Sequence, residues 1–302
     1  MSFSSDCKNE IMSHEIENST FLRAQLRGML CFFSRIGGNE LLLNCENGRL
    51  MEYIDTSFRR LGVELPRSCF TSGAKMNTFR CDDPSVIASV FSAAEFPREN
   101  ILQMELKELY NQETVSYFIS GVFLAAGRIS EPDKSYHLEF ATHRKRFAME
   151  LSQCLDTLDT TTGILVRGYN YIVYLKNSGQ IEDILTFMGS TDSSMLLMRT
   201  KIYKDIKNKV TRRVNCENAN AVRAVKASEN DRELIQKFYD AGARDSLGEE
   251  LAQLADIRLN NPELSLNEIV SLMNNGLTKS GVNHRLRKIR ETIKAYFENN
   301  GN

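Results

Sequence analysis

The sequence predicts two domains, an α+β domain with an internal duplication followed by an all-helical domain. Three observations lead to this fold class. Residues 21–38 and 114–131 are similar apolar stretches, and each is followed by the same order of helix and strand patterns. The strand patterns end near residue 190, after which only helical periodicity continues. The length of 302 residues also fits two domains of ordinary size.

Each half of the duplicated part reads as αββαββα, or close to it. The first half has helical patterns over 21–38, 46–61 and from residue 84, and strand patterns over 40–45, 65–71 and 75–81. The second half has helical patterns over 114–131, 144–158 and 180–188, and strand patterns over 136–141, 164–167 and 171–176. The turn Gly168-Tyr169-Asn170 joins the last two strands as a hairpin. We expect pseudo-repeats at about 19–95 and 112–190, within a domain that spans residues 1–190.

Two glycines, Gly28 and Gly121, occupy the same place in the two apolar stretches. Backbones approach most closely where the side chain is smallest. We therefore expect the two helices to pack against each other at a pseudo-two-fold axis near these glycines.

The composition is that of a globular protein and excludes several functional classes. The chain is 42% hydrophobic and 25% charged, and its formal net charge of -1 argues against a protein that coats nucleic acid indiscriminately. The seven cysteines are spread singly with no CxxC pair, so we expect reduced thiols, no metal site and no cofactor. No apolar run reaches the roughly 20 residues of a membrane span, and the polar start MSFSSDCKNEIM lacks a signal-peptide core. We expect a cytoplasmic protein that does not contact membranes.

The C-terminal part reads as a helical connector over 191–230 and a helical domain over 231–302. A first helix carries the apolar stripe Leu247, Leu251 and Leu254, and the pair Ser265 and Glu268 forms a capping box that opens a short second helix. The turn Asn274-Asn275-Gly276 follows, and Thr278 caps a longer helix. The apolar stripe of that helix comprises Val282, Leu286, Ile289, Ile293 and Phe297. This order is that of a helix-turn-helix.

The last helix is basic on the faces that its apolar stripe leaves free, which suits a helix that enters the major groove of DNA. The residues expected to face base edges are Lys279, Ser280, Asn283, His284 and Arg287. The residues expected to contact phosphates are Arg285, Lys288 and Arg290. We predict double-stranded DNA as the partner of residues 265–297. The alternative is a solvated basic face on an ordinary helix, but the capped short helix and the Asn-Gly turn favour DNA binding.

The segment ISGVFLAAG at 119–127 resembles the motif of the LAGLIDADG homing endonucleases, and LRGMLCFFS at 26–34 occupies the equivalent place in the first repeat. In that family an acidic residue near the end of each motif helix holds a divalent metal. These acidic positions fall on Phe33 and Ala126, and the earlier aspartate position falls on Cys31 and Leu124. None of these side chains offers the oxygen ligands that Mg²⁺ prefers. We therefore expect no catalytic residues, no metal and no enzymatic activity.

The whole chain resembles the WhiA family of bacterial regulators. The blocks that carry the resemblance are the opening MSFSSDCKNEIM, SGVFLAAGRISEPDKSYHLEF at 120–140, NCENANAVRAV at 215–225 and SLNEIVSLMNNGLTKSGVNHRLRKI at 265–289. The resemblance implies a LAGLIDADG-like domain that does not cleave DNA and a helix-turn-helix similar to sigma-factor region 4. It further implies a nucleoid-associated transcription regulator acting in cell division, chromosome segregation and, in spore formers, sporulation. In actinobacterial members an iron–sulfur regulator is the protein partner.

Two other functions stay open at this stage. The first is a division-complex or nucleoid-associated adaptor that binds DNA weakly and without specificity, and the second is an active homing-type endonuclease. The positions expected on the open face of the N-terminal sheet are Tyr136, Glu139, Tyr169 and Tyr171, a set that is not strongly basic. Protein binding by the N-terminal domain is therefore at least as well supported as a second DNA site.

Overall fold

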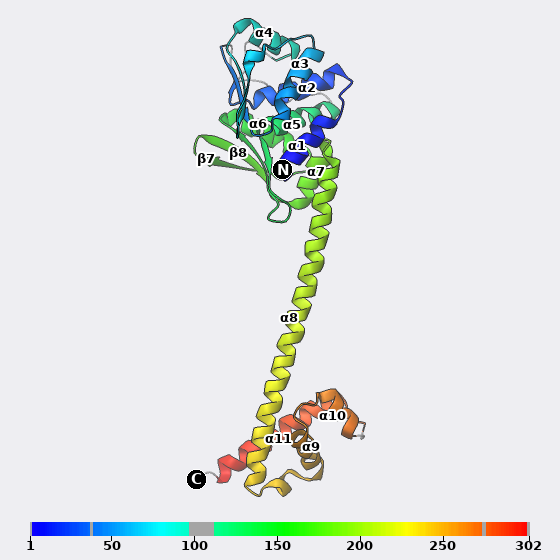
Figure 1. Cartoon of the computed structure of the whole chain (residues 1–302). Coiled ribbons are helices and arrows are strands. Elements are labelled where there is room, and N and C mark those ends of the chain that lie inside the picture. The colour runs from blue at the N-terminus through cyan, green and yellow to red at the C-terminus, as the bar shows by residue number, and fades with distance from the viewer. Residues whose placement is uncertain (1, 37–38, 97–111, 274–275, 301–302) are drawn as a thin grey trace. The chain divides into compact units, whose positions relative to one another are not determined.

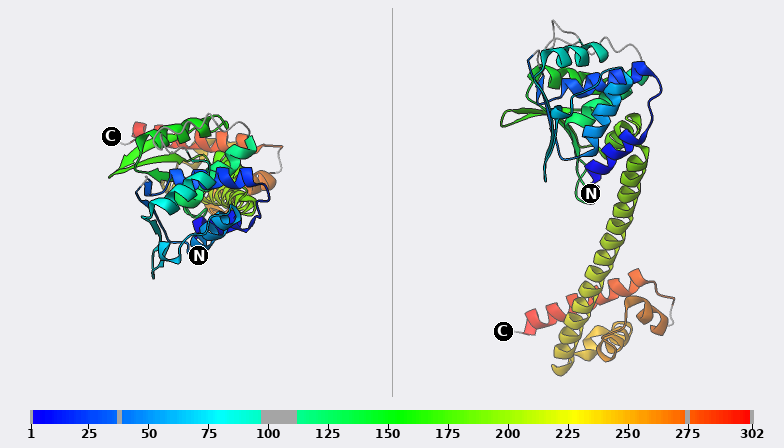
Figure 2. Two further views of the ribbon diagram at one scale, coloured as in Figure 1. Left: turned by 90° about the horizontal axis from the view of Figure 1, so that it is seen from above. Right: turned by 45° about the horizontal axis from the view of Figure 1, so that its top comes forward.

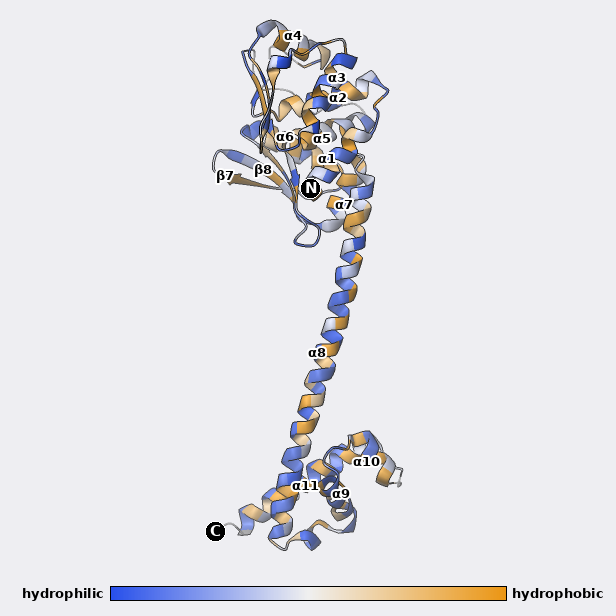
Figure 3. Ribbon diagram, in the orientation of Figure 1, coloured by the Kyte–Doolittle hydropathy of each residue, from blue (hydrophilic) through white to orange (hydrophobic). Residues whose placement is uncertain are grey.

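The computed structural model describes residues 2–36, 39–96, 112–273 and 276–300. It contains two compact units, residues 1–204 and 205–302 (Figure 1). The predicted connector 191–230 lies inside one helix of 50 residues, α8 (Thr191–Asp240), which belongs in part to each unit. Hydrophobic and hydrophilic residues are interleaved along α8 (Figure 3).

The first half of the N-terminal unit forms a four-stranded antiparallel sheet in the order β1-β2-β4-β3. Its elements are α2 (Ser19–Cys31), β1 (Arg35–Ile36), β2 (Leu41–Cys45), α3 (Arg49–Arg60), a 3-10 turn (Arg67–Cys69), β3 (Phe70–Ser72), β4 (Asn77–Cys81) and α4 (Pro84–Ala93). The strand predicted over 65–71 is wrong for its first half, because residues 67–69 form the 3-10 turn and pairing with β4 starts only at Phe70.

The second half repeats this plan, with the strand order β5-β6-β8-β7. Its elements are α5 (Gln112–Ala126), β5 (Gly127–Ile129), β6 (Leu138–Thr142), α6 (Lys145–Asp156), β7 (Gly163–Arg167), β8 (Asn170–Leu175) and α7 (Ser178–Phe187). The αββαββα order is thus confirmed in both halves. The helices gather on one side of the sheets (Figure 2), and strand residues alternate between that buried side and an open face.

The predicted close packing of the two motif helices, α2 and α5, is confirmed. A Cβ atom placed on Gly28 would lie 2.0 Å from the carbonyl oxygen of Phe118, and one on Gly121 would lie 1.9 Å from that of Gln25. Each glycine therefore meets the residue three positions before the other glycine. This reciprocity is the pseudo-two-fold symmetry expected of the duplication, and only glycine fits at both positions.

A further helix, α1 (Phe3–Ser13), precedes the first repeat and was not predicted from the sequence. Its buried residues Phe3, Cys7 and Ile11 are four positions apart and join the core of the N-terminal unit. Glu10 on the same helix accepts hydrogen bonds from the backbone N–H groups of Asp192 and Ser193, at 2.6 and 3.0 Å. Glu10 thereby caps the start of α8.

The C-terminal unit contains the end of α8, a 3-10 turn (Arg244–Leu247), α9 (Glu249–Asn260), α10 (Leu266–Met273) and α11 (Lys279–Asn300). Its core includes Phe238, Ile269, Val282, Leu286, Ile289 and Ile293. The predicted capping box is confirmed, because the N–H of Ser265 donates to Glu268 Oε2 at 2.7 Å and the N–H of Glu268 donates to Ser265 Oγ at 3.4 Å. Thr278 also caps α11, as predicted, by accepting from the N–H of Gly281 at 3.2 Å.

One predicted position of this unit differs in the structure, and one predicted turn is only partly described by it. Phe297, placed in the apolar stripe of α11, is 39% exposed, because α11 runs past the core at its C-terminal end. In the turn before α11, Asn274 and Asn275 lie outside the described residues, whereas Gly276 has a φ of 72°, the left-handed conformation expected there. None of the helices in the described part of the chain is both long enough and apolar enough to cross a membrane.

Candidate nucleic-acid interface

The N-terminal half of α11 presents six polar side chains to solvent. The buried residues Val282, Leu286 and Ile289 fix the rotation of the helix, so the positions between them point outward. The exposed members of the predicted site are Lys279, Ser280, Asn283, His284, Arg287 and Lys288. They are three adjacent pairs that repeat every four positions, so they share one broad face, which we call the α11 face.

The positive charge of the α11 face is largely free of internal partners. Among the described residues, no carboxylate lies within 4.0 Å of the ammonium groups of Lys279 and Lys288. Arg287 has only a long contact, with its Nε 3.9 Å from Glu291 Oε1, and both side chains are more than half exposed. Exposed pairs of this kind contribute little. The three cations are therefore available for the phosphates and bases of a nucleic acid.

The other two predicted residues, Arg285 and Arg290, have partners within the unit. Arg290 binds Asp231 of α8 through two hydrogen bonds, Nε to Oδ1 at 2.5 Å and the terminal nitrogen to Oδ2 at 3.0 Å. The Asp231 side chain is only 5% exposed, and this pairing raises the pKa of Arg290. Arg285 is half-buried and lies 3.1 Å from Glu250 of α9. Both arginines join helices of the unit to one another, and only the remaining six residues form the α11 face.

The C-terminal ends of the two motif helices are each contacted by a cation from another part of the unit. Arg144, at the start of α6, donates to the carbonyl oxygen of Phe33 at 3.1 Å and to that of Cys31 at 3.5 Å. Lys8 of α1 donates from Nζ to the carbonyl oxygen of Leu124 at 3.0 Å. Cys31 and Leu124 are the equivalent positions of the two motifs. A positive side chain from another part of the unit thus lies at the C-terminal end of each motif helix. The dipole of the motif helix favours a cation at that end.

The positive charges of Lys8 and Arg144 would repel a metal ion at the ends of the motif helices. Burial lowers the pKa of Lys8 to about 8, and burial also lowers the pKa of Arg144. Phe33 is buried at one acidic position, and Ala126 stands at the other. Within the described ranges, no group of three histidine, cysteine, aspartate or glutamate side chains could hold a metal. The sequence could not reveal this arrangement, since Lys8 and Leu124 are 116 residues apart.

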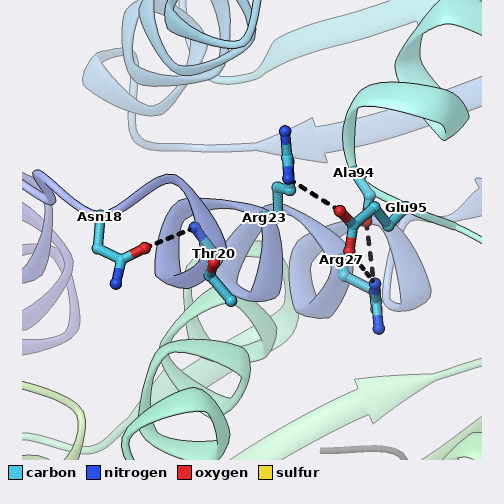
Figure 4. Close-up of polar contacts among 6 residues, drawn as sticks. All are labelled: Asn18, Thr20, Arg23, Arg27, Ala94 and Glu95. Atoms are coloured by element: carbon cyan, nitrogen blue, oxygen red, sulfur yellow. Dashed lines mark hydrogen bonds and ion pairs between the residues drawn. The ribbon is translucent and has the colours of Figure 1, made fainter.

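Other arginines of the N-terminal unit are also paired. On α2, Arg23 donates to Glu95 Oε1 at 2.8 Å, and Arg27 donates to the carbonyl oxygen of Ala94 at 3.3 Å (Figure 4). On the first sheet, Glu40 lies 2.8 Å from Arg35 and 3.3 Å from Arg80.

The second sheet is similar to the first in this respect, since Glu139 lies 3.7 Å from Arg167 and 3.3 Å from His137. Tyr169 is fully exposed at the hairpin turn. Tyr171, expected on the open face, instead packs partly against the core, because it pairs with the buried Thr142. Tyr136 lies beneath the ammonium of Lys204, 5.0 Å from the ring centre. The strands of this open face therefore carry one carboxylate, Glu139, and two arginines, Arg167 beside it and the exposed Arg128.

Comparison with known proteins places both units in one family. The family model of the WhiA LAGLIDADG-like domain matches residues 115–207, and that of the WhiA C-terminal HTH domain matches residues 210–293. A probable cell division protein WhiA from Clostridium tetani is 31% identical over 324 residues, and the match covers 100% of both chains. Another from Thermoanaerobacter pseudethanolicus is 37% identical over 195 residues, which are 65% of this chain and 61% of that relative.

The fold agrees with a solved structure. Full-length WhiA from Thermotoga maritima has a TM-score of 0.61 and 19% sequence identity to this chain, and the match covers 98% of this chain and 99% of that one. At this identity the likeness concerns the fold, which is a LAGLIDADG-like domain followed by a helical domain.

Proposed function

The chain belongs to the WhiA family, and from this premise we propose that it is a sequence-specific DNA-binding regulator that binds through the α11 face and does not cut DNA. The observation that carries the proposal is the exposure of Lys279, Arg287 and Lys288 next to Asn283 and Ser280. Arginine and lysine pair with guanine edges, and asparagine pairs with adenine. Cations on the same face contact phosphates.

The absence of cleavage is the second part of the proposal. The ends of the two motif helices carry Arg144 and Lys8, so a divalent cation would meet positive charge and carbonyls that are already hydrogen-bonded. A metal-dependent displacement needs carboxylates that hold the ion between the attacking and leaving oxygens. We infer that the N-terminal unit is better suited to protein contacts than to DNA, because three of the four arginines on its sheet strands, Arg35, Arg80 and Arg167, lie within 4.0 Å of Glu40 or Glu139.

The names of the relatives suggest the cellular process in which the protein acts. Several are probable cell division proteins, and we extend this role to the present chain, with nucleoid association, chromosome segregation and sporulation as its finer forms. An iron–sulfur regulator as partner of the N-terminal unit belongs to the same proposal. The alternative is an adaptor that holds a division complex on DNA without sequence preference, since the α11 face would also serve that role.

The test is fluorescence anisotropy of the full chain on duplexes selected from genomic fragments and on their scrambled counterparts. We expect a ratio of specific to non-specific affinity of roughly 10³ or more. Lys279→Gln should lower this ratio, whereas Lys294→Gln, a matched exposed lysine farther along α11, should leave it unchanged. Equal affinity for all duplexes would favour the adaptor. Products run on a gel after incubation with Mg²⁺ should show intact DNA, and cut DNA would overturn the second part of the proposal.

A further inference from the structure

Strand β7 is an unprotected edge of the second sheet. It is the last strand in the order β5-β6-β8-β7, and in the described part of the chain no strand pairs with its outer side. Its sequence, Gly-Ile-Leu-Val-Arg, has no proline, lysine or acidic residue, which are the usual means of blocking an edge. The equivalent edge of the first sheet is β3, with only three residues, of which Thr71 and Ser72 are exposed and polar. The two halves share one fold, but the edge strand of the second sheet is longer and more apolar than that of the first.

The side chains of β7 form an apolar patch at this edge. Val166 is 64% exposed and Ile164 is 42% exposed, and both point to the helix side of the sheet. Met149 of α6, the helix that packs against β7, is 46% exposed. Exposed apolar residues are common singly, but three around one open strand edge indicate a contact surface.

The hairpin register determines which backbone groups the edge presents. The turn between β7 and β8 has two residues, so its flanking pair Arg167 and Asn170 is hydrogen-bonded, and so is the pair Leu165 and Ile172. The alternate residues Ile164 and Val166 therefore direct their N–H and C=O groups outward. They are two positions apart, as an antiparallel partner strand requires.

We propose that β7 is a self-association edge, at which two copies of this chain pair antiparallel about a two-fold axis through Leu165. In this register Ile164 of each copy lies opposite Val166 of the other, and the two pairs exchange four backbone hydrogen bonds. Leu165 lies opposite its own counterpart. The exposed residues of both copies, with Met149 nearby, then form one continuous apolar surface.

The charges at the two ends of β7 favour a second copy in the antiparallel orientation. Arg167 stands at the C-terminal end, and it stays 64% exposed although it lies 3.7 Å from Glu139 of the same sheet. At the other end the Asp156 carboxylate accepts from the N–H and the hydroxyl of Thr162, at 3.2 and 2.9 Å. Antiparallel pairing brings Arg167 of each copy toward Asp156 of the other copy, so the dimer contains this approach twice. Parallel pairing would place like charges together. The edge is thus complementary to itself, as an isologous interface must be.

This inference does not depend on the proposed DNA binding, since it concerns the association of free chains. The two proposals connect in one consequence. A dimer carries two copies of α11, and paired helix-turn-helix units bind two half-sites related by symmetry.

The first test is sedimentation velocity of the full chain over a range of concentrations in the absence of DNA. We expect a reversible monomer–dimer equilibrium. Val166→Lys places like charges at the paired edge and should raise the dimer Kd at least about tenfold. Val166→Thr, which keeps the β-branched shape, is the matched control and should have a much smaller effect. A wild-type chain that stays monomeric, or a Val166→Lys chain that dimerises as well as the wild type, would overturn the proposal.

The second test checks the register and does not depend on the strength of association. In a Cys216→Ser background, which removes the exposed native thiol, Leu165→Cys should form an intermolecular disulfide on mild oxidation, since the two Cβ atoms would lie about 5 Å apart. Arg167→Cys should not cross-link, because its opposite residue in this register is Gly163. Equal cross-linking of both variants, or cross-linking of neither, would contradict a two-fold axis at Leu165. Binding of a foreign extended peptide at β7, with no self-association, would also overturn the proposal.

Discussion

The two units contain cations of the same kind and use them in opposite ways. In the N-terminal unit, Arg144 and Lys8 point inward and donate to the last carbonyls of the motif helices. In the C-terminal unit, Lys279 and Lys288 point outward, and among the described residues no carboxylate lies within 4.0 Å of them. Both regions resemble DNA-binding architectures. Of the four cations named, only Lys279 and Lys288 are available for a ligand.

This difference shows that a fold related to DNA enzymes does not by itself make a DNA site. Net charge alone would not separate the two regions, because both contain arginines and lysines near helix ends. The separation comes from the partners of each side chain. We therefore propose that the cations with internal partners are structural and that those of the α11 face bind DNA.

The largest expected effect concerns the contact that positions the motif helices. Gly121→Ala should lower the free energy of unfolding by about 3 kcal/mol, because the new Cβ would lie 1.9 Å from a backbone carbonyl oxygen that cannot easily move. Gly168→Ala is a useful control, since no atom lies within 4 Å of a Cβ there and the cost comes only from its φ of 61°. Denaturant unfolding of both variants measures this. Equal losses would mean that the helices do not pack as described.

A second prediction separates the two kinds of arginine within α11 itself. Arg290→Gln should lower the free energy of unfolding by about 2 kcal/mol, because it leaves the buried Asp231 carboxylate without its cation. Arg287→Gln, three positions earlier and exposed, should change stability by about 0.5 kcal/mol or less. Thermal unfolding monitored by circular dichroism checks both. If Arg287→Gln were the more destabilising variant, the assignment of the two roles would be reversed.

The smallest effect is a pH dependence at the start of α8. Burial raises the pKa of Glu10, but hydrogen bonds from Ser193, Asp192 and Ser190 outweigh it, and the pKa in the folded state lies below its ordinary value. The stabilisation is therefore complete above the unfolded pKa of about 4.3 and is lost as the pH falls through the folded value. Glu10→Gln should abolish this acid-dependent loss of stability, measured as the difference between the free energies of unfolding at about pH 6 and about pH 3. An unchanged pH dependence in the variant would contradict the capping role.

Periodicity and turn chemistry were enough to predict most of the fold. The αββαββα order, the close approach at Gly28 and Gly121, and the capping box at Ser265 all depend on residues near one another or on a repeated pattern. Strands β1 and β5 were missed because two or three residues give no alternation to read. Helix α1 was missed because its buried residues form a single narrow stripe in a polar segment.

The site was less predictable, for a physical reason. The sequence of α11 shows which residues are basic, but not which of them have partners elsewhere. Asp231, which binds Arg290, is 59 residues away in the chain, and Arg144 is 111 residues from Phe33. Such pairs depend on tertiary packing between elements with no local relation. The sequence therefore suggested eight residues for the DNA site, and the structure leaves six of them exposed.

The most direct test of the central claim is the salt dependence of DNA binding by the full chain and two variants. Each phosphate that a cation neutralises adds about 0.9 to the slope of log affinity against log salt concentration. We predict that Lys288→Gln lowers this slope by about 1, whereas Lys8→Gln leaves both the slope and the affinity unchanged. A slope that falls with Lys8→Gln and not with Lys288→Gln would place the DNA on the N-terminal unit and contradict the account.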